Sequence, residues 1–385
     1  MPETHSPAKP DIADQFPILE NGLYFNHAAI GPWPRCAAEA VQQFAEENLR
    51  QGSGGYREWY ARENDLRQGL KTLLGASSTA DIALLKNTSE GISTVAFGLD
   101  WQPGDNIVLP ADEFPSNRLP WLAQADKGVD IREIDIRAAA NAEQALLDAI
   151  DADTRLLSVS AVQWQDGFRL DLEVLGEACR RRGVLFFVDA IQQLGALPMD
   201  VQGCHIDFLA ADAHKWLLAP EGIAVFFCSE SARPQLQLLQ QGWHMFERPF
   251  DFERSQWTPA SSAKRFEAGS PNTIGQAALH ASVQLLLRFG MEDVGHRVLA
   301  NTRFLMEQLA DIPGARIASR ESARRQSGIV SFAIDSIPLD SLHHQLAEAG
   351  ASTVIRGQAI RVSPHFYQDE TQLGRFLEII VRALP

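Results

Sequence analysis

The feature that most constrains this chain is the alternation of short apolar segments with segments of helical periodicity, which begins near residue 80. Strands that alternate with helices predict βαβ units and therefore a mainly parallel sheet. The strand-like segments are almost continuously apolar, which is typical of strands covered by helices on both faces. We therefore predict an α/β domain. Its strand-like segments span 81–86, 106–110, 155–162, 184–190, 207–212 and 223–228, and its helix-like segments span 91–99, 117–128 and 172–183.

The last third of the chain has a different pattern. Two amphipathic helices are expected at 278–290 and 296–312, and the strands and helices after them suit a small α+β unit. The first 20 residues are polar and contain proline. We therefore expect an N-terminal arm at 1–20 that packs with the small domain, a large domain at 21–285 and a small C-terminal domain at 286–385.

Composition limits the partners. The chain has 34 basic and 49 acidic residues and a formal net charge of −15, which argues against binding to nucleic acid or to an anionic membrane. Four cysteines stand far apart without ligand spacing, so neither a disulfide scaffold nor a zinc ribbon is expected. The N-terminus does not resemble a signal peptide, and no apolar run approaches the ~18 residues of a membrane span. We expect a cytoplasmic protein without a metal.

Ligands of open α/β sheets bind beyond the carboxyl ends of the strands, where two groups of polar residues occur. Residues 87–91, Asn-Thr-Ser-Glu-Gly, stand between a strand and a helix. Thr88 or Ser89 would cap that helix, and its free N–H groups would suit a phosphate. Asp189 ends an apolar strand, where a carboxylate is costly to bury without a partner. The alternative for both groups is an ordinary helix cap.

Two basic residues follow apolar strands. Lys215 comes 26 residues after Asp189, and a desolvated lysine has a lowered pKa and is a usable amine nucleophile. Arg361 interrupts an apolar strand and suits bidentate binding of a carboxylate. A solvated loop lysine and an edge-strand arginine are the alternatives. The order of phosphate loop, strand-end aspartate, lysine and distal arginine nevertheless matches what pyridoxal phosphate (PLP) chemistry needs.

At this point the sequence resembles the class V aminotransferases of the fold-type I PLP enzymes, a group that includes cysteine desulfurases and isopenicillin-N epimerase. The resemblance implies a mainly parallel seven-stranded sheet, a smaller α+β C-terminal domain, PLP as the cofactor, and a homodimer with shared active sites. It extends from YFNHAAIGPWP (24–34) to AIRVSPHFY (359–367) and rests on the segments KNTSEGI, DEFPSNRLPW, FFVDAIQQLGALPMDV, HIDFLAADAHKWLLAPEGIAVFF and RFEAGSPNTIG.

The resemblance assigns roles to residues of this sequence. Lys215 would form the Schiff base and Asp189 would pair with the pyridine nitrogen, so these two are the expected catalytic residues. Arg361 would bind the substrate carboxylate, and Asn26 and His27 would line the substrate side. The remaining cofactor contacts would be Thr88 and Ser89 at the phosphate, Phe114 stacked on the pyridine ring, Gln163 and Gln192 at the phenolic oxygen, His214 beside the lysine, and Thr273 at the phosphate of the neighbouring subunit.

Two departures from the family pattern stand out. Asp212 occupies the position of a phosphate-binding serine in many desulfurases, so it is expected to point elsewhere or to pair with a basic group. The short segment before Arg361 contains no cysteine, whereas the desulfurases carry a nucleophilic thiol there. The sequence therefore predicts that this chain is not a desulfurase with a loop cysteine.

The expected substrate is an amino acid or a small amine. Transamination ranks first among the reactions, and PLP-dependent lyase or epimerase chemistry follows because these reactions share one carbanion intermediate. A catalytically idle scaffold subunit is the alternative from another class, and intact Lys215, Asp189 and Arg361 argue against it. A dinucleotide-binding dehydrogenase is disfavoured because no GxGxxG follows the first strand.

Overall fold

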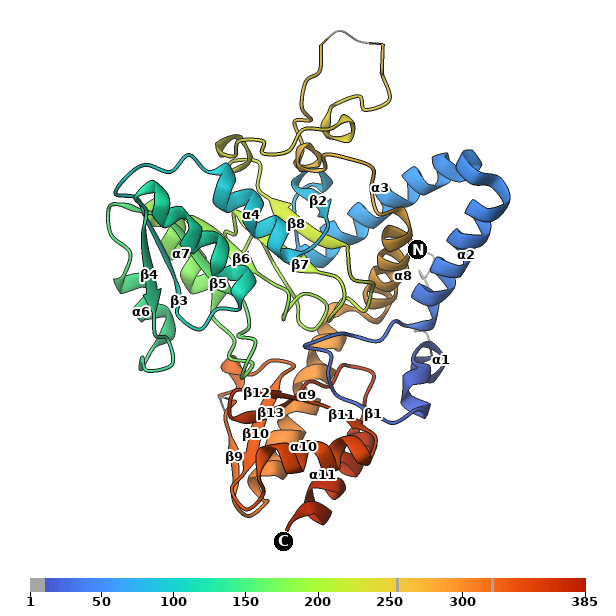
Figure 1. The fold of residues 1–385 in the computed structure, drawn as a ribbon, viewed down its shortest axis with the longest axis vertical. Helices are drawn as coiled ribbons and strands as arrows, with labels where there is room; N and C mark the ends of the chain where they lie inside the picture. The colour runs from blue at the N-terminus through green and yellow to red at the C-terminus, as the bar shows by residue number, and fades with distance from the viewer. Residues whose placement is uncertain (1–10, 254–255, 320–321) are drawn as a thin grey trace, which may run out of the picture.

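The computed structural model describes residues 11–253, 256–319 and 322–385. Figure 1 shows a larger α/β body above a smaller α+β body. The larger body is built on a seven-stranded sheet. In spatial order the strands are β2 (Ile82–Leu85), β8 (Ala224–Cys228), β7 (Phe208–Asp212), β6 (Leu185–Asp189), β5 (Thr154–Ser160), β3 (Asn106–Pro110) and β4 (Asp130–Ile134).

The central strands pair in parallel from β7 to β4, and β8 runs antiparallel to both β7 and β2. Alternate residues of each strand enter two separate cores: Val108 packs in one and Ile107 in the other. Both faces of the sheet are thus covered, which explains the continuous apolar strands. The predicted fold class is confirmed. The helices around this sheet are α2 (Arg35–Gln51), α3 (Tyr56–Leu74), α4 (Thr88–Gly98), α5 (Leu119–Leu122), α6 (Ala142–Asp148), α7 (Leu172–Arg182) and α8 (Thr273–Phe289).

The smaller body contains a four-stranded antiparallel sheet in the order β12-β13-β10-β9. Its own core includes Phe332, Leu342 and Phe376. A short parallel pair joins the N-terminal β1 (Leu23–Tyr24) to β11 (Ala351–Ser352). The other elements are α9 (Met291–Ala310), β9 (Ala315–Ile317), β10 (Val330–Ile334), α10 (Leu339–Glu348), β12 (Val354–Arg356), β13 (Ala359–Val362) and α11 (Glu370–Ala383).

The predicted domain limits can be compared with the packing, although they stay a prediction. Helix α9 packs into the cores of both bodies, because Val298 lies in the large core and Leu305 in the small one. Leu23 also packs in the small core, so the chain touches the small body before it builds the large one. The arm at 1–20 contains α1 (Ile12–Gln15), and the ring of Phe16 stacks on Tyr367 with centroids 3.8 Å apart. Residues 1–10 of the arm lie outside the described residues.

Candidate active site

The carboxyl ends of the three central strands bring the expected residues to one edge of the sheet. Strand β5 ends at Ser160, which pairs in register with Asp189 at the end of β6. Strand β7 ends at Asp212, and Lys215 follows in the turn after it. A residue at the end of each strand is held by the sheet itself, so this edge is a rigid support for a ligand.

Asp189 is almost completely buried, with 1% of its surface exposed. Its Oδ1 accepts a hydrogen bond from the N–H of Ile191 at 3.0 Å, the bond of a local cap. Burial, and then the charge of Glu113, raise the pKa of Asp189 to about 7, and Lys215 opposes the shift. The cap alone does not compensate the buried carboxylate, so this position suits a partner that brings a proton or a positive charge.

Lys215 is desolvated, as the sequence predicts. The pKa of its amine is lowered to about 8, mainly by burial; Asp189 opposes the change and the positive charge of Arg361 contributes to it. Its Nζ lies 5.7 Å from the centroid of the Phe114 ring. The Phe114 ring in turn meets Trp164 edge-on, with centroids 5.5 Å apart. A reactive amine therefore faces an aromatic surface against which a flat cofactor ring could pack.

The first turn of α4 lies next to the end of β7. Asn87 caps this helix by accepting from the N–H of Glu90 at 2.9 Å, so the expectation that Thr88 or Ser89 is the cap is wrong. The Thr88 hydroxyl instead accepts from the Asp212 N–H at 2.9 Å, and the Ser89 hydroxyl donates to Ser116 at 2.8 Å. The helix N-terminus still offers N–H groups of the kind that bind phosphate.

Asp212 has the basic neighbour that the sequence predicts. Its Oδ1 lies 3.1 Å from Nδ1 of His214, and both side chains are largely buried. His214 Nδ1 forms no hydrogen bond among the described residues, so this approach is a contact between the two side chains and not a hydrogen bond. The roles of Thr88, Ser89 and His214 at a phosphate stay predictions.

The side chains of Gln192 and His27 form more hydrogen bonds within the protein than the sequence suggests. The Gln192 amide donates to Ala28 O at 3.0 Å and accepts from the Trp216 indole at 2.9 Å. Both ring nitrogens of His27 are also engaged, with Ser363 O at 2.7 Å and the Tyr367 hydroxyl at 2.5 Å. Their contacts to cofactor and substrate stay predictions, and the structure adds a role in tying the N-terminal segment to the site.

The same N-terminal segment passes directly against the catalytic turn. The N–H of Gly31 donates to His214 O at 2.6 Å, and a Cβ at Gly31 would stand 2.2 Å from the backbone oxygen of Lys215. Only glycine allows this approach. Asn26 lies earlier in the segment, and its side-chain oxygen is buried without a partner among the described residues.

Arg361 lies on β13 and has 2% of its surface exposed. Its Nη1 donates to Trp164 O at 2.7 Å, whereas its Nε is buried without a hydrogen-bond partner among the described residues. Burial, followed by the charge of Arg356, lowers the pKa of Arg361 to about 9. A buried guanidinium with an unused donor suits an incoming carboxylate.

The interaction of Glu113 with Gln163 was not predicted from the sequence. Gln163 Nε2 donates to Glu113 Oε1 at 3.1 Å, and Gln163 Oε1 is buried without a partner in the described residues. Glu113 directly precedes Phe114. An acidic residue next to the expected stacking residue was the available signal, but only the fold shows that Glu113 turns inward.

Thr273 is the first residue of α8, and the preceding Asn272 donates to Gly222 O at 2.9 Å. It lines a small hollow with Trp59, Glu63 and His244. In that region Glu63, His244 and Glu267 have the spacing of metal ligands. Arg67 and Lys264 already pair with these carboxylates, at 2.8 and 3.8 Å from Glu63, so the trio is better described as a neutralised ion-pair cluster than as a metal site.

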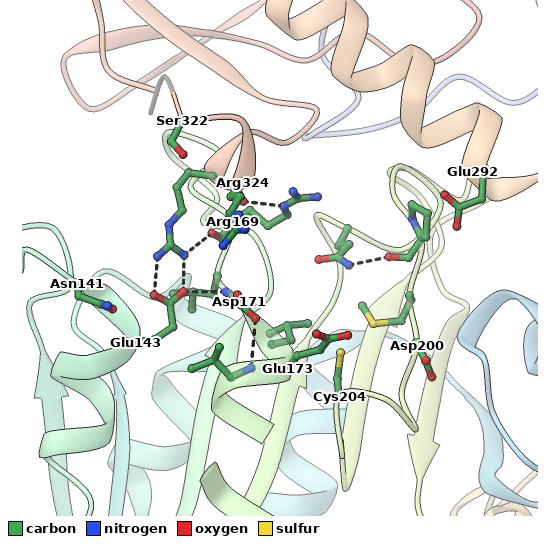
Figure 2. Close-up of a pocket in the computed structure, with 17 residues that line it drawn as sticks. Asn141, Glu143, Arg169, Asp171, Glu173, Asp200, Cys204, Glu292, Ser322 and Arg324 are labelled. Atoms are coloured by element: carbon green, nitrogen blue, oxygen red, sulfur yellow. Dashed lines mark hydrogen bonds and ion pairs between the residues drawn. The ribbon is translucent and has the colours of Figure 1, made fainter. Parts of the chain in front are cut away.

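A larger cavity, of about 940 Å³, lies between the two bodies. Its lining is of mixed charge, with Arg169 and Arg324 in one part and the carboxylates of Asp171, Glu173 and Asp200 near Cys204 (Figure 2). Burial, and then these carboxylates, raise the pKa of the Cys204 thiol to about 12. None of the residues predicted to bind cofactor or substrate lines this cavity, so it is separate from the candidate active site.

The fold and the site define the class of protein: a PLP-dependent α/β enzyme. An unpaired buried donor at Arg361, a desolvated Lys215 and a buried Asp189 are the features that fit this cofactor. The sequence profile of the family described as aminotransferase class-V matches residues 23–374. The chain belongs to this family.

Similar proteins and solved structures are consistent with membership of this family. A protein of Methanothermobacter thermautotrophicus named probable cysteine desulfurase is 29% identical over 394 residues, covering 96% of this chain and 97% of that protein. The structure of the cystine C–S lyase C-DES with its product, cysteine persulfide, is 27% identical with a TM-score of 0.87, covering 94% and 98% of the two chains. A C-DES variant with glycine covalently linked to the PLP cofactor is 27% identical with a TM-score of 0.88, covering 96% and 98%. The predicted family, fold and cofactor are confirmed.

The comparisons correct the predicted reaction. Transamination as the leading function is wrong, and so is the exclusion of the cysteine desulfurases, because the relatives are named for desulfurase and C–S lyase activity. The exclusion depended on one missing loop cysteine, whereas the likeness to these relatives extends over nearly the whole chain. The general expectation of a PLP enzyme holds.

The described residues contain no helix that is both long and apolar enough to cross a membrane.

Proposed function

We propose that this chain is a PLP-dependent enzyme that cleaves the carbon–sulfur bond of cysteine or of a cysteine derivative such as cystine. The observation that carries the proposal is the chain-wide likeness to the cystine C–S lyase, with a TM-score of 0.87 and coverage of 94% and 98% of the two chains. The geometry around Lys215, Asp189 and Arg361 supports it, because these residues supply the parts that such a reaction needs.

Bound PLP would take up the electron pair of the substrate Cα–H bond, which weakens the bond between Cβ and sulfur. Lys215 holds the cofactor and, once the substrate amine replaces it, accepts the Cα proton at Nζ. An amine with a pKa of about 8 is suited to this task near neutral pH. The carboxylate of Asp189 holds a proton at the pyridine nitrogen, and Arg361 orients the substrate through its carboxylate. In elimination the sulfur leaves with the electrons of the Cβ–S bond and the carbon product becomes pyruvate and ammonia. In desulfuration an external thiol takes the sulfur, the electron pair stays on Cβ, and protonation there gives alanine.

A second arginine favours substrates with an additional anionic group. In the pairing of β12 with β13, Val354 lies opposite Arg361, so Arg356 is a diagonal neighbour on the same face of the sheet. Both arginines act on Lys215, lowering its pKa. Neither forms an ion pair with a carboxylate among the described residues, although the chain has more acids than bases. Cystine, with two carboxylates, could engage both.

The cysteines of the chain bear on where the sulfur goes. Cys228 ends β8 opposite Phe208, the first residue of β7, and so lies at the edge of the sheet remote from Asp212. Burial raises the pKa of Cys179 to about 12. The Cys36 thiol is half-buried and donates to Ala281 O at 3.6 Å. An external thiol is therefore part of the assay, so that desulfuration and elimination can each be detected.

The test is product analysis with purified holoenzyme. L-Cysteine and L-cystine are supplied with and without dithiothreitol, and sulfide, persulfide, alanine, pyruvate and ammonia are measured. We expect sulfur release in equal amounts with one carbon product. Alanine would identify desulfuration, and pyruvate with ammonia would identify elimination. A keto acid formed without sulfur release, or no turnover of either substrate, would refute the proposal.

We also propose a homodimer in which Thr273 of each chain contacts the cofactor phosphate of the other. Large aromatic side chains near this region support it, since Phe250 and Phe252 are 48% and 65% exposed and such surfaces suit an interface. A Lys215→Ala chain mixed with a Thr273→Val chain should form hybrid dimers that recover one working site. Full activity of a monomer at high dilution would contradict the arrangement.

A further inference from the structure

The loop after β3 reaches into the candidate site through Glu113. This side chain is 5% exposed and lies beside the end of β5. Its Oε1 accepts from the Ser160 N–H at 2.6 Å and from Gln163 Nε2 at 3.1 Å, and its Oε2 contacts the Ser160 hydroxyl. Ser160 pairs in register with Asp189, so these bonds join the loop to the strand next to the buried aspartate.

Glu113 has no cationic partner among the described residues, although its neighbour has one. Asp112 pairs with Arg137, which also pairs with Asp166 at 2.8 Å. Glu113 instead faces neutral groups and the carboxylate of Asp189, and an ionised Glu113 would raise the pKa of Asp189. An ionised carboxylate is costly to bury without a cation, and two ionised carboxylates near each other are costlier still.

We propose that Glu113 is a positioning residue that, as a neutral carboxylic acid, fixes the Gln163 amide and the end of β5 beside Asp189. Oε1 accepts two N–H groups and Oε2 contacts the Ser160 hydroxyl, which donates to it when Glu113 is ionised. In the proposed neutral state, the proton lies on Oε2 and the Ser160 hydroxyl rotates to accept it. Burial raises the pKa of Glu113, in agreement with this state. A neutral Glu113 leaves Asp189 as the single negative charge available to the cofactor nitrogen.

The orientation of Gln163 follows from this contact. Because the NH₂ of Gln163 is donated to Glu113, its Oε1 is turned away, and this oxygen is buried without a partner among the described residues. The next residue, Trp164, holds Arg361 through its carbonyl and packs against Phe114. Glu113 thus sets the position of the segment that lies between the aromatic side of the site and its carboxylate-binding arginine.

The protonation state is tested by difference infrared spectroscopy of the cofactor-free protein at pH 8. Glu113→Gln should remove one C=O stretching band of a protonated carboxyl group. Asp112→Asn, an equivalent change at the adjacent ion-paired residue, should leave that band unchanged. Loss of only a carboxylate band in Glu113→Gln would show that Glu113 is ionised and would overturn the proposal.

The positioning role is tested by PLP affinity, measured by fluorescence titration of cofactor-free protein. Glu113→Gln keeps every hydrogen bond as a neutral amide, so its affinity should stay within about threefold of wild type. Glu113→Ala should weaken PLP binding by ~10-fold or more, because it frees Gln163 and Ser160. Equal losses in the two variants, or no loss in Glu113→Ala, would refute the proposal. If Glu113→Ala does not fold, Glu113→Gln and the infrared band decide.

Both readouts are independent of the proposed C–S cleavage. A protein that binds PLP normally but leaves cysteine and cystine intact would refute the proposed function and leave the role of Glu113 standing. The role of Glu113 fails only through the infrared band or the pattern of affinities.

Discussion

Two regions of the molecule carry the candidate chemistry, and they differ in how they are built. The first is the edge of the large sheet, where Asp189 and Lys215 follow central strands buried on both faces. The second is the β12–β13 hairpin of the small body, which carries Arg356 and Arg361. The large-sheet edge suits a cofactor and the hairpin suits a substrate. The first region therefore carries the residues that indicate the cofactor, while in the proposed function the choice of substrate depends on the second.

The two regions share a physical signature. Burial raises the pKa of Asp189 to about 7, lowers that of Lys215 to about 8 and lowers that of Arg361 to about 9. Each charge is therefore held in surroundings that disfavour it, which lowers the stability of the cofactor-free chain. Perturbed groups gathered in one place are typical of a functional site, and a bound cofactor and substrate would compensate them.

The largest expected effect comes from removing the amine of the large-sheet edge. Lys215→Ala should lower C–S cleavage by at least ~10⁴-fold, since one residue both holds the cofactor and accepts the Cα proton. Borohydride reduction of wild type followed by peptide mapping should place the cofactor on Lys215. Attachment to another lysine, or near-normal turnover of Lys215→Ala, would break the assignment of this edge to the cofactor.

Asp189→Asn is expected to cause the next largest loss of turnover. The amide keeps the local cap from Ile191 possible but cannot hold a proton at the pyridine nitrogen as a carboxylate does. Turnover should fall by ~10³-fold, about 4 kcal/mol in the barrier, while the cofactor remains attached. Single-turnover rates measure this directly. A loss of no more than about threefold would mean that Asp189 is only a cap.

Substitutions of the hairpin arginines should have smaller effects on kcat/KM than substitutions at the sheet edge. Arg361→Gln removes a charge-assisted contact to the substrate carboxylate and should lower kcat/KM by ~10- to 100-fold for every amino acid. Arg356→Gln should matter only for substrates with a second anionic group: a loss of ~10-fold for cystine and little for cysteine. Equal losses for both substrates in Arg356→Gln would remove the argument for a dianionic substrate.

The sequence predicted the parts of the fold that follow simple patterns. Apolar strands such as β6 and β7 were found because both faces are buried. Strand β4 was missed because it is an edge strand, and its sequence Asp-Ile-Arg-Glu-Ile carries charges in place of a continuous apolar run. Charged or polar residues also obscure α2 and α3, whose apolar stripes are narrow.

The site was predictable where a residue's position along a strand decides its role, and less so where packing decides it. Asp189, Lys215 and Arg361 each follow or interrupt an apolar strand. Glu113 could not be assigned from the sequence because its role depends on Ser160 and Gln163, about 50 residues away. The desulfurases were wrongly excluded because one absent thiol before Arg361 was given more weight than the likeness of the whole chain. Transamination was wrongly ranked first because the sequence identified no pocket residues that distinguish it from the related reactions.

The smallest expected effect is a shift in pH dependence, and it links the two regions. The folded pKa of Lys215 is about 8, below its ordinary value of 10.5, so the folded cofactor-free chain releases this proton earlier than the unfolded chain. Protonated Lys215 therefore destabilises the fold below about pH 8, and the penalty is relieved as the pH rises from 8 to 10.5. Only the neutral amine attacks PLP.

The rate of PLP attachment to cofactor-free protein should accordingly rise about tenfold per pH unit at low pH and level off near pH 8. Stopped-flow absorbance measures it. Asp189→Asn removes a charge that raises the Lys215 pKa, so its plateau should begin at lower pH, whereas Arg356→Gln removes a charge that lowers this pKa and should move the plateau upward. A rate that keeps rising to pH 10 in wild type would show that Lys215 is solvated. Identical profiles in all three proteins would show that the hairpin and the sheet edge do not act on the same amine.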